Sequence, residues 1–474
     1  MAGRGQIALK NFFIFNPTYG PREGEEHKKI MYYYPKNADI DTKIKHVGLC
    51  EAIITFTQTF TDKPCETLHT QKTREIFFQP ERDFWMVMTV SVPYTERMKD
   101  GQVYLEYHEE DVQDPVMEAV VRQAYRMFTL FNGSIYYLLE KLNGETKSLQ
   151  QRIEHFFSRY LLTLRLGSCD LLDVFSGISF LPLDKNTYLQ VQCFINILES
   201  TFPSVKYTAF LYNDQLVWSG LEQDDMRIMY KYLTTSLFPA YLEQELQASG
   251  HQHGSHQTMG RNLSMPNVGN VHFGKFITGP PNIQNETNMG KIPRLYINTE
   301  YENEECFLLV YRAMSASVCL LLNSSSTINF DLCKKLDSFL GNQLTQLASE
   351  IGDQYSSRTK QQPSSEPIFK YIYFNHMNLA QKTTVHKDSQ KNAGAYVPQD
   401  TLKLLCDISS DLQRNNQDGE TFVKTLSECW VVGKKSDQRE MVVVINQKNL
   451  NLIEVNDEVK KLCSLNFNSI FFQD

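Results

Sequence analysis

One local pattern occurs three times along the chain and limits the possible fold more than any other feature: a short strand, a turn, a second strand and then a helix. The clearest copy spans Lys206–Leu237. β-branched and aromatic residues fill two short runs, and Asn213-Asp214 between them tolerates the positive φ of a tight turn. Apolar residues then recur at helical spacing from Met226 onwards, and Pro239 is predicted to end that helix.

The same order of elements is predicted near both ends of the chain. The two further copies comprise Phe12–Phe15, Ile30–Tyr34 and a helix over Ile40–Phe60 near the N-terminus, and Phe369–Phe374, Thr383–His386 and a helix from Pro398 to Leu412 near the C-terminus. A chain of 474 residues is too long for one ordinary hydrophobic core, so three similar domains are expected, at 8–168, 169–355 and 368–474. Residues 247–270, rich in Gly, Ser, His, Gln and Asn, are expected to form a mobile insertion, and 356–367 a polar linker.

Each domain is predicted to be of the α+β class, an α/β sandwich in which helices flank a sheet. In the first domain Trp85–Val90 is almost continuously apolar, which is typical of a central strand, and helices are predicted over 116–142 and 149–166. The strands predicted after the helix of the third domain are Thr421–Thr425, Glu428–Val432, Met441–Asn446 and Leu452–Val455. Lys434-Lys435-Ser436-Asp437 is predicted to form a hairpin turn, and a short helix around Val459 to close the domain.

The helix predicted over Ile40–Phe60 is unusual because it is apolar on two sides. On a helical wheel one apolar face holds Ile40, Ile44, Val47 and Ile54, and the nearly opposite face holds Leu49, Ile53, Phe56 and Phe60. A surface helix normally has one apolar stripe, so a helix with two needs two partners. One partner is the sheet of its own domain. The other is either a second chain or a neighbouring domain of the same chain, and a bend at Gly48 would also account for the pattern.

Composition limits which cellular compartment and which classes of binding partner are expected. The net charge of −8 argues against a nucleic-acid binder, although local basic patches leave contact with an acidic membrane surface open. Ten cysteines without a Cys-x-x-Cys pair favour free thiols in a reducing compartment. The N-terminus has no signal-peptide core, and no run reaches the ~20 apolar residues that span a bilayer. A cytoplasmic protein with at most peripheral membrane association is therefore expected.

The sequence contains no motif of covalent catalysis. It lacks the P-loop, the Gly-x-Ser-x-Gly elbow and the His-Glu-x-x-His zinc motif. The histidines at His251, His253 and His256 lie in a polar tract without a packed shell, so a metal site is not expected there. Asp224-Asp225 is explained by the positive end of a helix dipole.

One basic group is a candidate for contact with lipid. The cations Lys434, Lys435 and Arg439 would lie close together at the predicted hairpin turn. They can face acidic headgroups, and the alternative is a solvated hairpin tip.

Several longer strings resemble one known family, the vacuolar fusion proteins of the calcium–caffeine–zinc-sensitivity type in their animal form. The strings are Phe15-Asn16-Pro17, Gly20–Gly24, Val47–Ile53, Leu68–Lys72, Tyr207–Arg227, Phe374–Ala380, Trp430–Asp437 and Asn446–Asn449. The resemblance covers residues 9 to 474. It implies three Longin-type domains, each with a mixed antiparallel five-stranded sheet flanked by helices.

The resemblance also implies a function that composition and periodicity do not show. Such proteins pair with a second triple-Longin chain, the monensin-sensitivity subunit, and the heterodimer is a guanine-nucleotide exchange factor for the late-endosomal Rab GTPase, Rab-seven. The expected setting is endosome maturation and autophagosome–lysosome fusion, with peripheral recruitment to endosomal, lysosomal and autophagosomal membranes and with room for a third accessory subunit. No cofactor, metal or catalytic residue is expected.

In this family the first Longin domains of the two subunits pair and form the GTPase-binding surface, which favours a second chain as the other partner of the two-sided helix. The residues expected to supply part of that surface are Ile44, Val47, Gly48, Leu49, Ile53 and Phe56. The alternative function is a Longin scaffold or tether in membrane fusion that has no exchange activity.

Overall fold

The computed structural model describes residues 5–99, 102–250, 274–284, 286–297, 302–361, 369–385, 397–415, 418–447 and 449–467. The chain divides into two compact units. Unit 1 holds Met1–Ser176, Pro367–Met377 and Thr383–Asp474, and unit 2 holds Gly177–Glu366 and Asn378–Lys382. Each of the three predicted domains contributes one antiparallel sheet with helices packed against it, so the predicted α+β class is confirmed.

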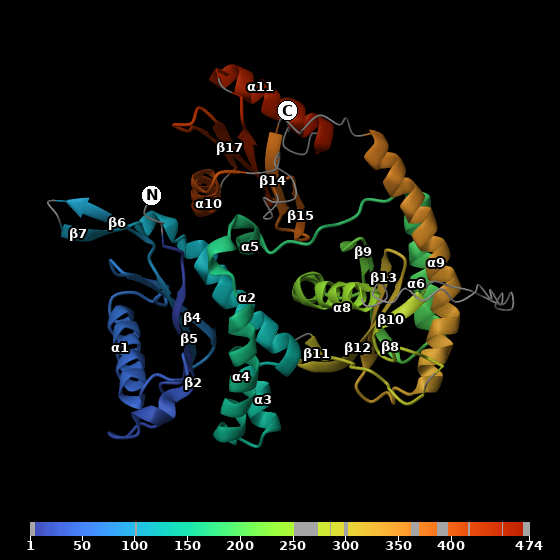
Figure 1. Ribbon diagram of the computed structural model, residues 1–474, viewed down its shortest axis with the longest axis horizontal. Coiled ribbons are helices and arrows are strands. Elements are labelled where there is room, and N and C mark those ends of the chain that lie inside the picture. The colour runs from blue at the N-terminus through green and yellow to red at the C-terminus, as the bar shows by residue number, and fades with distance from the viewer. Residues whose placement is uncertain are drawn as a thin grey trace. The chain divides into compact units, whose positions relative to one another are not determined.

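The first sheet, in unit 1, has the strand order β2-β1-β5-β4-β3. Its elements are β1 (Leu9–Phe15), β2 (Ile30–Tyr34), β3 (Thr67–His69), β4 (Thr73–Glu81), β5 (Phe84–Ser91), α1 (Ile40–Gln58), α2 (Asp114–Asn132), α3 (Ile135–Lys141) and α4 (Thr146–Tyr160). α1 covers one face of the sheet, and α2 and α4 cover the other (Figure 1). β5 is the central strand, and every residue from Phe84 to Val90 is buried, as its apolar sequence predicts.

The helices after the first sheet are shorter than predicted. The single helix expected over 116–142 is broken at Gly133, whose φ of 79° ends α2. Ser134 then starts α3, because its hydroxyl accepts a hydrogen bond from the backbone N–H of Tyr137 at 3.1 Å. The helix expected over 149–166 ends at Tyr160, and a short helix, α5 (Leu171–Phe175), follows.

The third sheet has the order β15-β14-β18-β17-β16. Its elements are β14 (Phe369–Asn375), β15 (Ala380–Thr383), β16 (Gly419–Lys424), β17 (Trp430–Ser436), β18 (Arg439–Ile445), α10 (Gln399–Arg414) and α11 (Leu452–Asn466). The strand predicted at Leu452–Val455 is wrong, because this segment is the first turn of α11. Asn451 and Glu454 form a capping box there, with each side chain bonded to the other residue's backbone N–H, at 2.9 and 2.8 Å.

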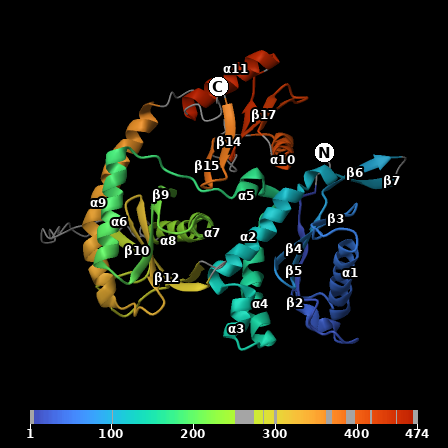
Figure 2. The same cartoon turned by 180° about the vertical axis from the view of Figure 1, so that it is seen from behind.

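Unit 2 contains a sheet of order β10-β12-β13-β8-β9, with β11 also paired to β12, so it has six strands where five were expected. Its elements are α6 (Lys185–Thr201), β8 (Val205–Tyr212), β9 (Gln215–Ser219), α7 (Gln223–Tyr232), α8 (Phe238–Gly250), β10 (Gly274–Thr278), β11 (Arg294–Ile297), β12 (Glu304–Ala313), β13 (Ala316–Asn323) and α9 (Phe330–Gln361). α6 and α9 lie side by side over one face (Figures 1 and 2). The predicted tight turn is confirmed, with φ values of 45° at Asn213 and 61° at Asp214.

Pro239 does not end the helix that precedes it, in contrast to the prediction. α7 widens into a π-helical turn, Leu233–Leu237, and α8 continues from there. Pro239 is thus the second residue of α8, directly after a π-helical turn, where the regular hydrogen-bond ladder that a proline breaks is already interrupted. The neighbouring Phe238 is 1% exposed, so burial of its ring favours continuation of the helix.

Two predicted irregular stretches begin inside helices. α8 extends to Gly250, so the predicted insertion at 247–270 starts as helix, and its remainder, with His251, His253 and His256, lies outside the described residues. α9 extends to Gln361, which includes the first part of the polar linker predicted at 356–367. The rest of that linker also lies outside the described residues, and the three domain boundaries stay predictions.

Candidate partner-binding surface

α1 carries the predicted site residues, and local sequence fixes where it starts. The Asp39 carboxylate accepts a hydrogen bond from the backbone N–H of Thr42 at 3.0 Å, which caps the first turn. The helix continues to Gln58 and is helical at Gly48. A Cβ placed on Gly48 would meet no atom within 4 Å, so bare backbone faces solvent there.

One face of α1 belongs to the core of unit 1. Val47, Cys50 and Ile54 are 2, 2 and 5% exposed. They pack against side chains of the first sheet, namely Phe13, Phe15, Tyr33, Phe77, Trp85 and Val87. This contact is the expected attachment of the helix to its own sheet.

The other face of α1 is apolar and open. Leu49, Phe56 and Phe60 are 55, 65 and 75% exposed. Leu49, half-buried Ile53 and Phe56 follow one another at steps of four and three residues, which places them along one line of the helix surface. Phe60 lies two residues beyond the end of α1, in the turn that follows the helix. The rings of Phe56 and Phe60 lie 5.0 Å apart, edge to face. We call Gly48, Leu49, Ile53, Phe56 and Phe60 the α1 stripe.

Polar contacts beneath and beside α1 hold the helix in place. The Tyr33 hydroxyl lies 2.6 Å from Nδ1 of His46, and the Cys50 thiol donates to the Glu75 carboxylate at 3.8 Å. Burial raises the pKa of Glu75 and, more strongly, that of the Cys50 thiol. These groups form part of the seam between helix and sheet, so the α1 stripe is presented on a fixed support.

The six residues predicted to form the binding surface therefore fall into three groups by exposure: exposed, half-buried and buried. Gly48, Leu49 and Phe56 are exposed, and Ile44 and Ile53 are half-buried. The prediction for Val47 is wrong. Its side chain points into the core, because it shares the helix face of Cys50 and Ile54, and so it cannot contact a partner directly. The sequence prediction omitted Phe60 from the site although it placed this residue on the correct face.

The predicted basic group also needs correction. Lys434 lies within β17 and not in a turn, and it is 7% exposed. Its ammonium forms an ion pair at 2.6 Å with the carboxylate of Glu420, the residue opposite it on the neighbouring strand β16. Lys435 donates to the Leu412 carbonyl at 3.1 Å and, like Arg439, is half-buried. Lys434 is thus a structural residue, and the turn itself lies at Asp437, whose φ is 52°.

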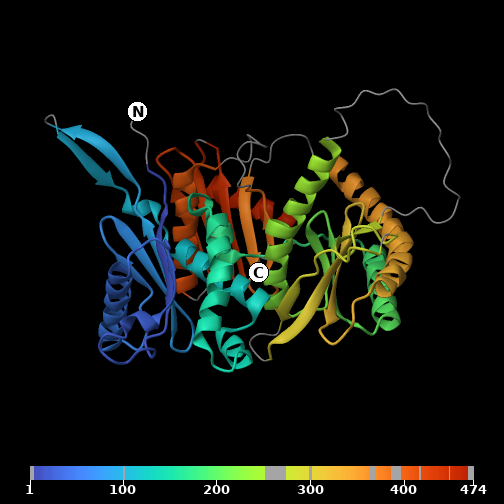
Figure 3. The same cartoon turned by 60° about the horizontal axis from the view of Figure 1, so that its bottom comes forward.

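A hairpin that the sequence prediction missed stands apart from the first sheet. β6 (Tyr94–Lys99) and β7 (Gln102–Tyr107) pair only with each other among the described strands, and they extend beyond the five-stranded sheet (Figure 3). Part of the signal was present in the sequence: Asp100-Gly101, a dipeptide typical of tight hairpin turns, is followed by Val103–Tyr107, a run rich in valine, leucine and tyrosine.

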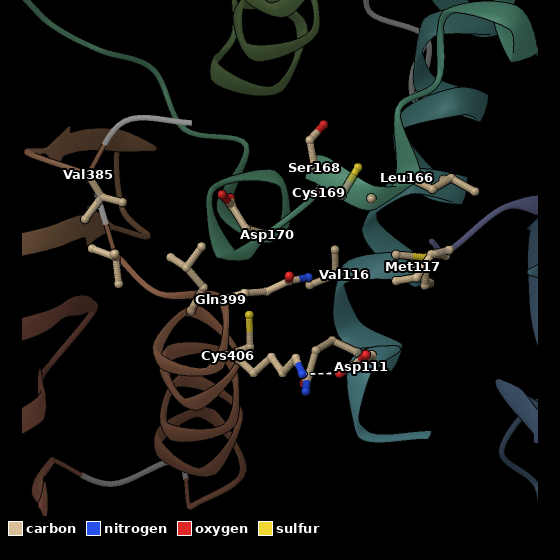
Figure 4. A pocket seen from close by; sticks show the side chains of 16 residues that line it. Asp111, Val116, Met117, Leu166, Ser168, Cys169, Asp170, Val385, Gln399 and Cys406 are labelled. Atoms are coloured by element: carbon tan, nitrogen blue, oxygen red, sulfur yellow. Dashed lines mark hydrogen bonds and ion pairs between the residues drawn. The ribbon is translucent and has the colours of Figure 1, made fainter. Parts of the chain in front are cut away.

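A cavity of about 260 Å³ lies inside unit 1, between α2, the segment 166–170 and α10 (Figure 4). The Lys403 ammonium forms an ion pair with the Asp111 carboxylate, and both residues line the cavity. Burial raises the pKa of the nearby Cys406 to about 12, so this thiol stays protonated at neutral pH and is a poor nucleophile. The cavity therefore lies where three segments of unit 1 meet, and Cys406 is not an activated nucleophile within it.

Among the described residues, no group of three or more His, Cys, Asp or Glu side chains is arranged to hold a metal ion. No helix among them is long and apolar enough to cross a membrane.

Comparison with known proteins places this surface in a family. A model of the first Longin domain of INTU, CCZ1 and HPS4 matches residues 9–133, and models of Intu longin-like domains 2 and 3 match 205–346 and 365–462. The vacuolar fusion protein CCZ1 homolog of Nematostella vectensis is 55% identical over 98% of both chains, and that of Xenopus laevis is 53% identical over 98% of both. The chain belongs to the CCZ1 family.

The CCZ1 family relationship spans the whole chain and not one domain. The vacuolar fusion protein CCZ1 homolog of Dictyostelium discoideum is 30% identical, again over 98% of both chains. The resemblance stated from sequence strings is thereby confirmed, as is the Longin-type fold, since three longin models match in succession. The α1 stripe lies in the part of this CCZ1-family chain that the first Longin model covers.

Proposed function

We propose that this chain is one subunit of a two-chain guanine-nucleotide exchange factor for the late-endosomal Rab GTPase, Rab-seven, and that it acts in vacuolar or lysosomal membrane fusion. The observation that carries the proposal is the α1 stripe: exposed Leu49, Phe56 and Phe60 with half-buried Ile53, along and just beyond a helix of a CCZ1-family first Longin domain. The names of the relatives, vacuolar fusion protein CCZ1 homolog, support the fusion setting.

The α1 stripe suits a protein partner. Leu49, Phe56 and Phe60 expose apolar surface that water solvates poorly, and large exposed apolar patches mark interaction sites. Aromatic side chains are enriched among the residues that dominate binding energy. Gly48 leaves room for a second helix to approach the backbone closely. The proposed partner is the monensin-sensitivity Longin subunit, with the GTPase binding across the paired first domains.

Exchange needs no covalent step from this chain. An exchange factor binds the nucleotide-free GTPase more tightly than the GDP-bound form. By linkage, the factor that prefers the empty GTPase weakens the hold on GDP in the same proportion. The magnesium and phosphate ligands belong to the GTPase, so the proposed role of this chain is to supply binding surface. We propose accordingly that it is a regulatory subunit and that it is recruited to endosomal membranes peripherally.

The test is release of a fluorescent GDP from the late-endosomal Rab, measured with this chain alone, with the partner subunit alone and with both. We expect fast release only with both chains. Leu49→Asp should slow that release by at least about ten-fold, because a carboxylate is placed in an apolar interface. The matched control is Leu465→Asp, since Leu465 is a 73% exposed leucine on another helix, α11.

The outcomes separate exchange from scaffolding. Normal exchange by folded Leu49→Asp protein would remove the α1 stripe from the mechanism. If the two chains form a complex that binds the Rab without speeding GDP release, the alternative function, a Longin tether without exchange activity, replaces the proposal.

A further inference from the structure

The β6–β7 hairpin has two chemically different faces. Residues directly opposite each other in an antiparallel pair point to the same side, and alternate residues share a side. The pairs Tyr94–Tyr107, Glu96–Leu105 and Met98–Val103 therefore form one face. Five of these six side chains are apolar or aromatic.

This apolar face is uncovered. Met98 and Val103 are 76 and 61% exposed, and Leu105 and Tyr94 are 42 and 39% exposed. On the opposite face, polar side chains contact one another: Arg97 forms an ion pair with Glu106 at 2.5 Å, and the Thr95 hydroxyl lies 3.0 Å from Nε2 of His108. The side that lacks partners is thus the apolar one.

The hairpin also lacks the support that a sheet normally has. It forms its own two-stranded sheet among the described strands, and an isolated two-stranded hairpin is marginal in water. Its inner end is tied to the rest of unit 1 by a hydrogen bond from the N–H of Gly5 to the Tyr94 carbonyl, at 3.0 Å. A binding partner on the apolar face would supply the missing burial.

Charge favours a protein over a bilayer as that partner. Glu96 lies in the middle of the apolar face, where it would meet acidic headgroups or hydrocarbon unfavourably. The basic residues Arg97 and Lys99 are offset by Glu96 and Glu106, so the described strands carry no net positive charge. Tyrosine and methionine, by contrast, are enriched at protein interfaces.

The position of the hairpin indicates which protein the partner is. The hairpin begins next to the N-terminal end of α2 and projects from there toward the side of unit 1 on which α1 lies (Figures 1 and 2). A chain that covers the α1 stripe therefore lies on the side toward which the hairpin projects. We infer that the β6–β7 hairpin is an arm that clasps the partner Longin subunit by its apolar face, with Glu96 facing a basic side chain of that subunit. This inference rests on the proposed heterodimer.

The experiment uses the full chain and the partner subunit. The Met98→Asp/Val103→Asp double variant should weaken the affinity for the partner by at least about ten-fold, because two carboxylates would be buried in an apolar contact. Thermal unfolding should be unchanged, since both side chains are exposed. The control is Tyr104→Ser. Tyr104 lies on the opposite, polar face of the hairpin, so this variant should keep wild-type affinity for the partner. Amide hydrogens of 94–99 and 102–107 should exchange more slowly when the partner is bound.

The readouts distinguish this arm from the proposed function itself. Wild-type affinity in the double variant, with unchanged amide exchange of the hairpin on binding, overturns the arm even if Leu49→Asp abolishes GDP release. Weakened affinity without any GDP release in the wild type supports the arm and contradicts the exchange function.

Two further measurements test whether a membrane or a second copy of this chain binds the apolar face instead. Loss of binding to vesicles of phosphatidylcholine and phosphatidylserine in the double variant, at unchanged partner affinity, would assign the face to a membrane and overturn the inference. Conversion of a dimer of this chain alone to a monomer, by sedimentation, would assign it to a second copy and overturn it equally.

Discussion

Leu49 and Cys50 are adjacent in the chain and lie on different faces of α1, one 55% exposed and the other 2% exposed. The core of unit 1 holds the Cys50 side, and the α1 stripe occupies the Leu49 side. Because a helix turns by about 100° per residue, single substitutions can address either side separately. Stability and partner binding should therefore respond to different residues of the same helix.

The first prediction compares Val47 with Phe56. Val47→Ala should lower the free energy of unfolding by about 2 kcal/mol, because it removes buried methyl groups from a packed core. Phe56→Ala should leave unfolding almost unchanged but weaken binding of the partner subunit, since its ring is 65% exposed. Urea denaturation and a binding titration measure the two effects. An unfolding penalty at Phe56 as large as that at Val47 would contradict the assignment of faces.

The second prediction concerns Glu75 and pH. Burial raises the pKa of this carboxyl above its ordinary value of 4.5, so the folded chain holds the proton more tightly than the unfolded chain. Its contribution to stability is therefore fully present below pH 4.5 and is lost as pH rises from 4.5 through the raised pKa. Glu75→Gln should raise the Tm at pH 7, and the gain should vanish near about pH 3.5.

Thermal unfolding scans across pH measure this effect. The control is Glu96→Gln, because Glu96 is exposed on the β6–β7 hairpin and should give no comparable gain. A Tm difference between Glu75→Gln and the wild type that does not change with pH would contradict the explanation by proton linkage.

The third prediction concerns the ion pair between Asp111 and Lys403, whose side chains are 6 and 14% exposed. Lys403→Met should destabilise unit 1 by about 3 kcal/mol, because it leaves the Asp111 carboxylate buried without its cation. The double variant Asp111→Leu/Lys403→Met should recover much of that loss, since no unpaired charge remains. Guanidinium denaturation of the three proteins measures this. A double variant no more stable than Lys403→Met would show that the pair acts through other contacts.

The sequence predicted elements well where one physical signal dominated. The buried strand Phe84–Val90 and the turn at Asn213-Asp214 have the expected positions, because continuous apolar character and positive φ each leave few alternatives. The two-sided character of α1 was also predictable. Val47 was assigned to the wrong environment, since a helical wheel gives spacing but not which of two faces meets the sheet.

Other features were missed because tertiary contacts outweighed local preference. Pro239 continues a helix since a π-helical turn precedes it and Phe238 is buried, neither of which a proline signal reveals. Leu452–Val455 has strand-like composition, but the Asn451–Glu454 capping box commits it to a helix. The ion pair of Lys434 with Glu420 depends on strand register, which composition alone does not fix.

The last prediction concerns Gly433 in β17, where the third sheet meets α10. A Cβ at this position would overlap Cγ2 of Ile408 and lie 3.0 Å from Cδ1 of Leu412. Gly433→Ala should therefore lower the free energy of unfolding by about 1–3 kcal/mol, because the helix must move away from the sheet. Gly419→Ala on β16 is the control, since no atom lies within 4 Å of its added Cβ.

A second variant shows whether the loss at Gly433 comes from crowding. Adding Ile408→Ala to Gly433→Ala removes the overlapping Cγ2, so the added alanine should cost much less in this background than in the wild type. Chemical denaturation of the four proteins completes the cycle. If alanine at Gly433 costs the same with and without Ile408, close approach of α10 does not explain the glycine.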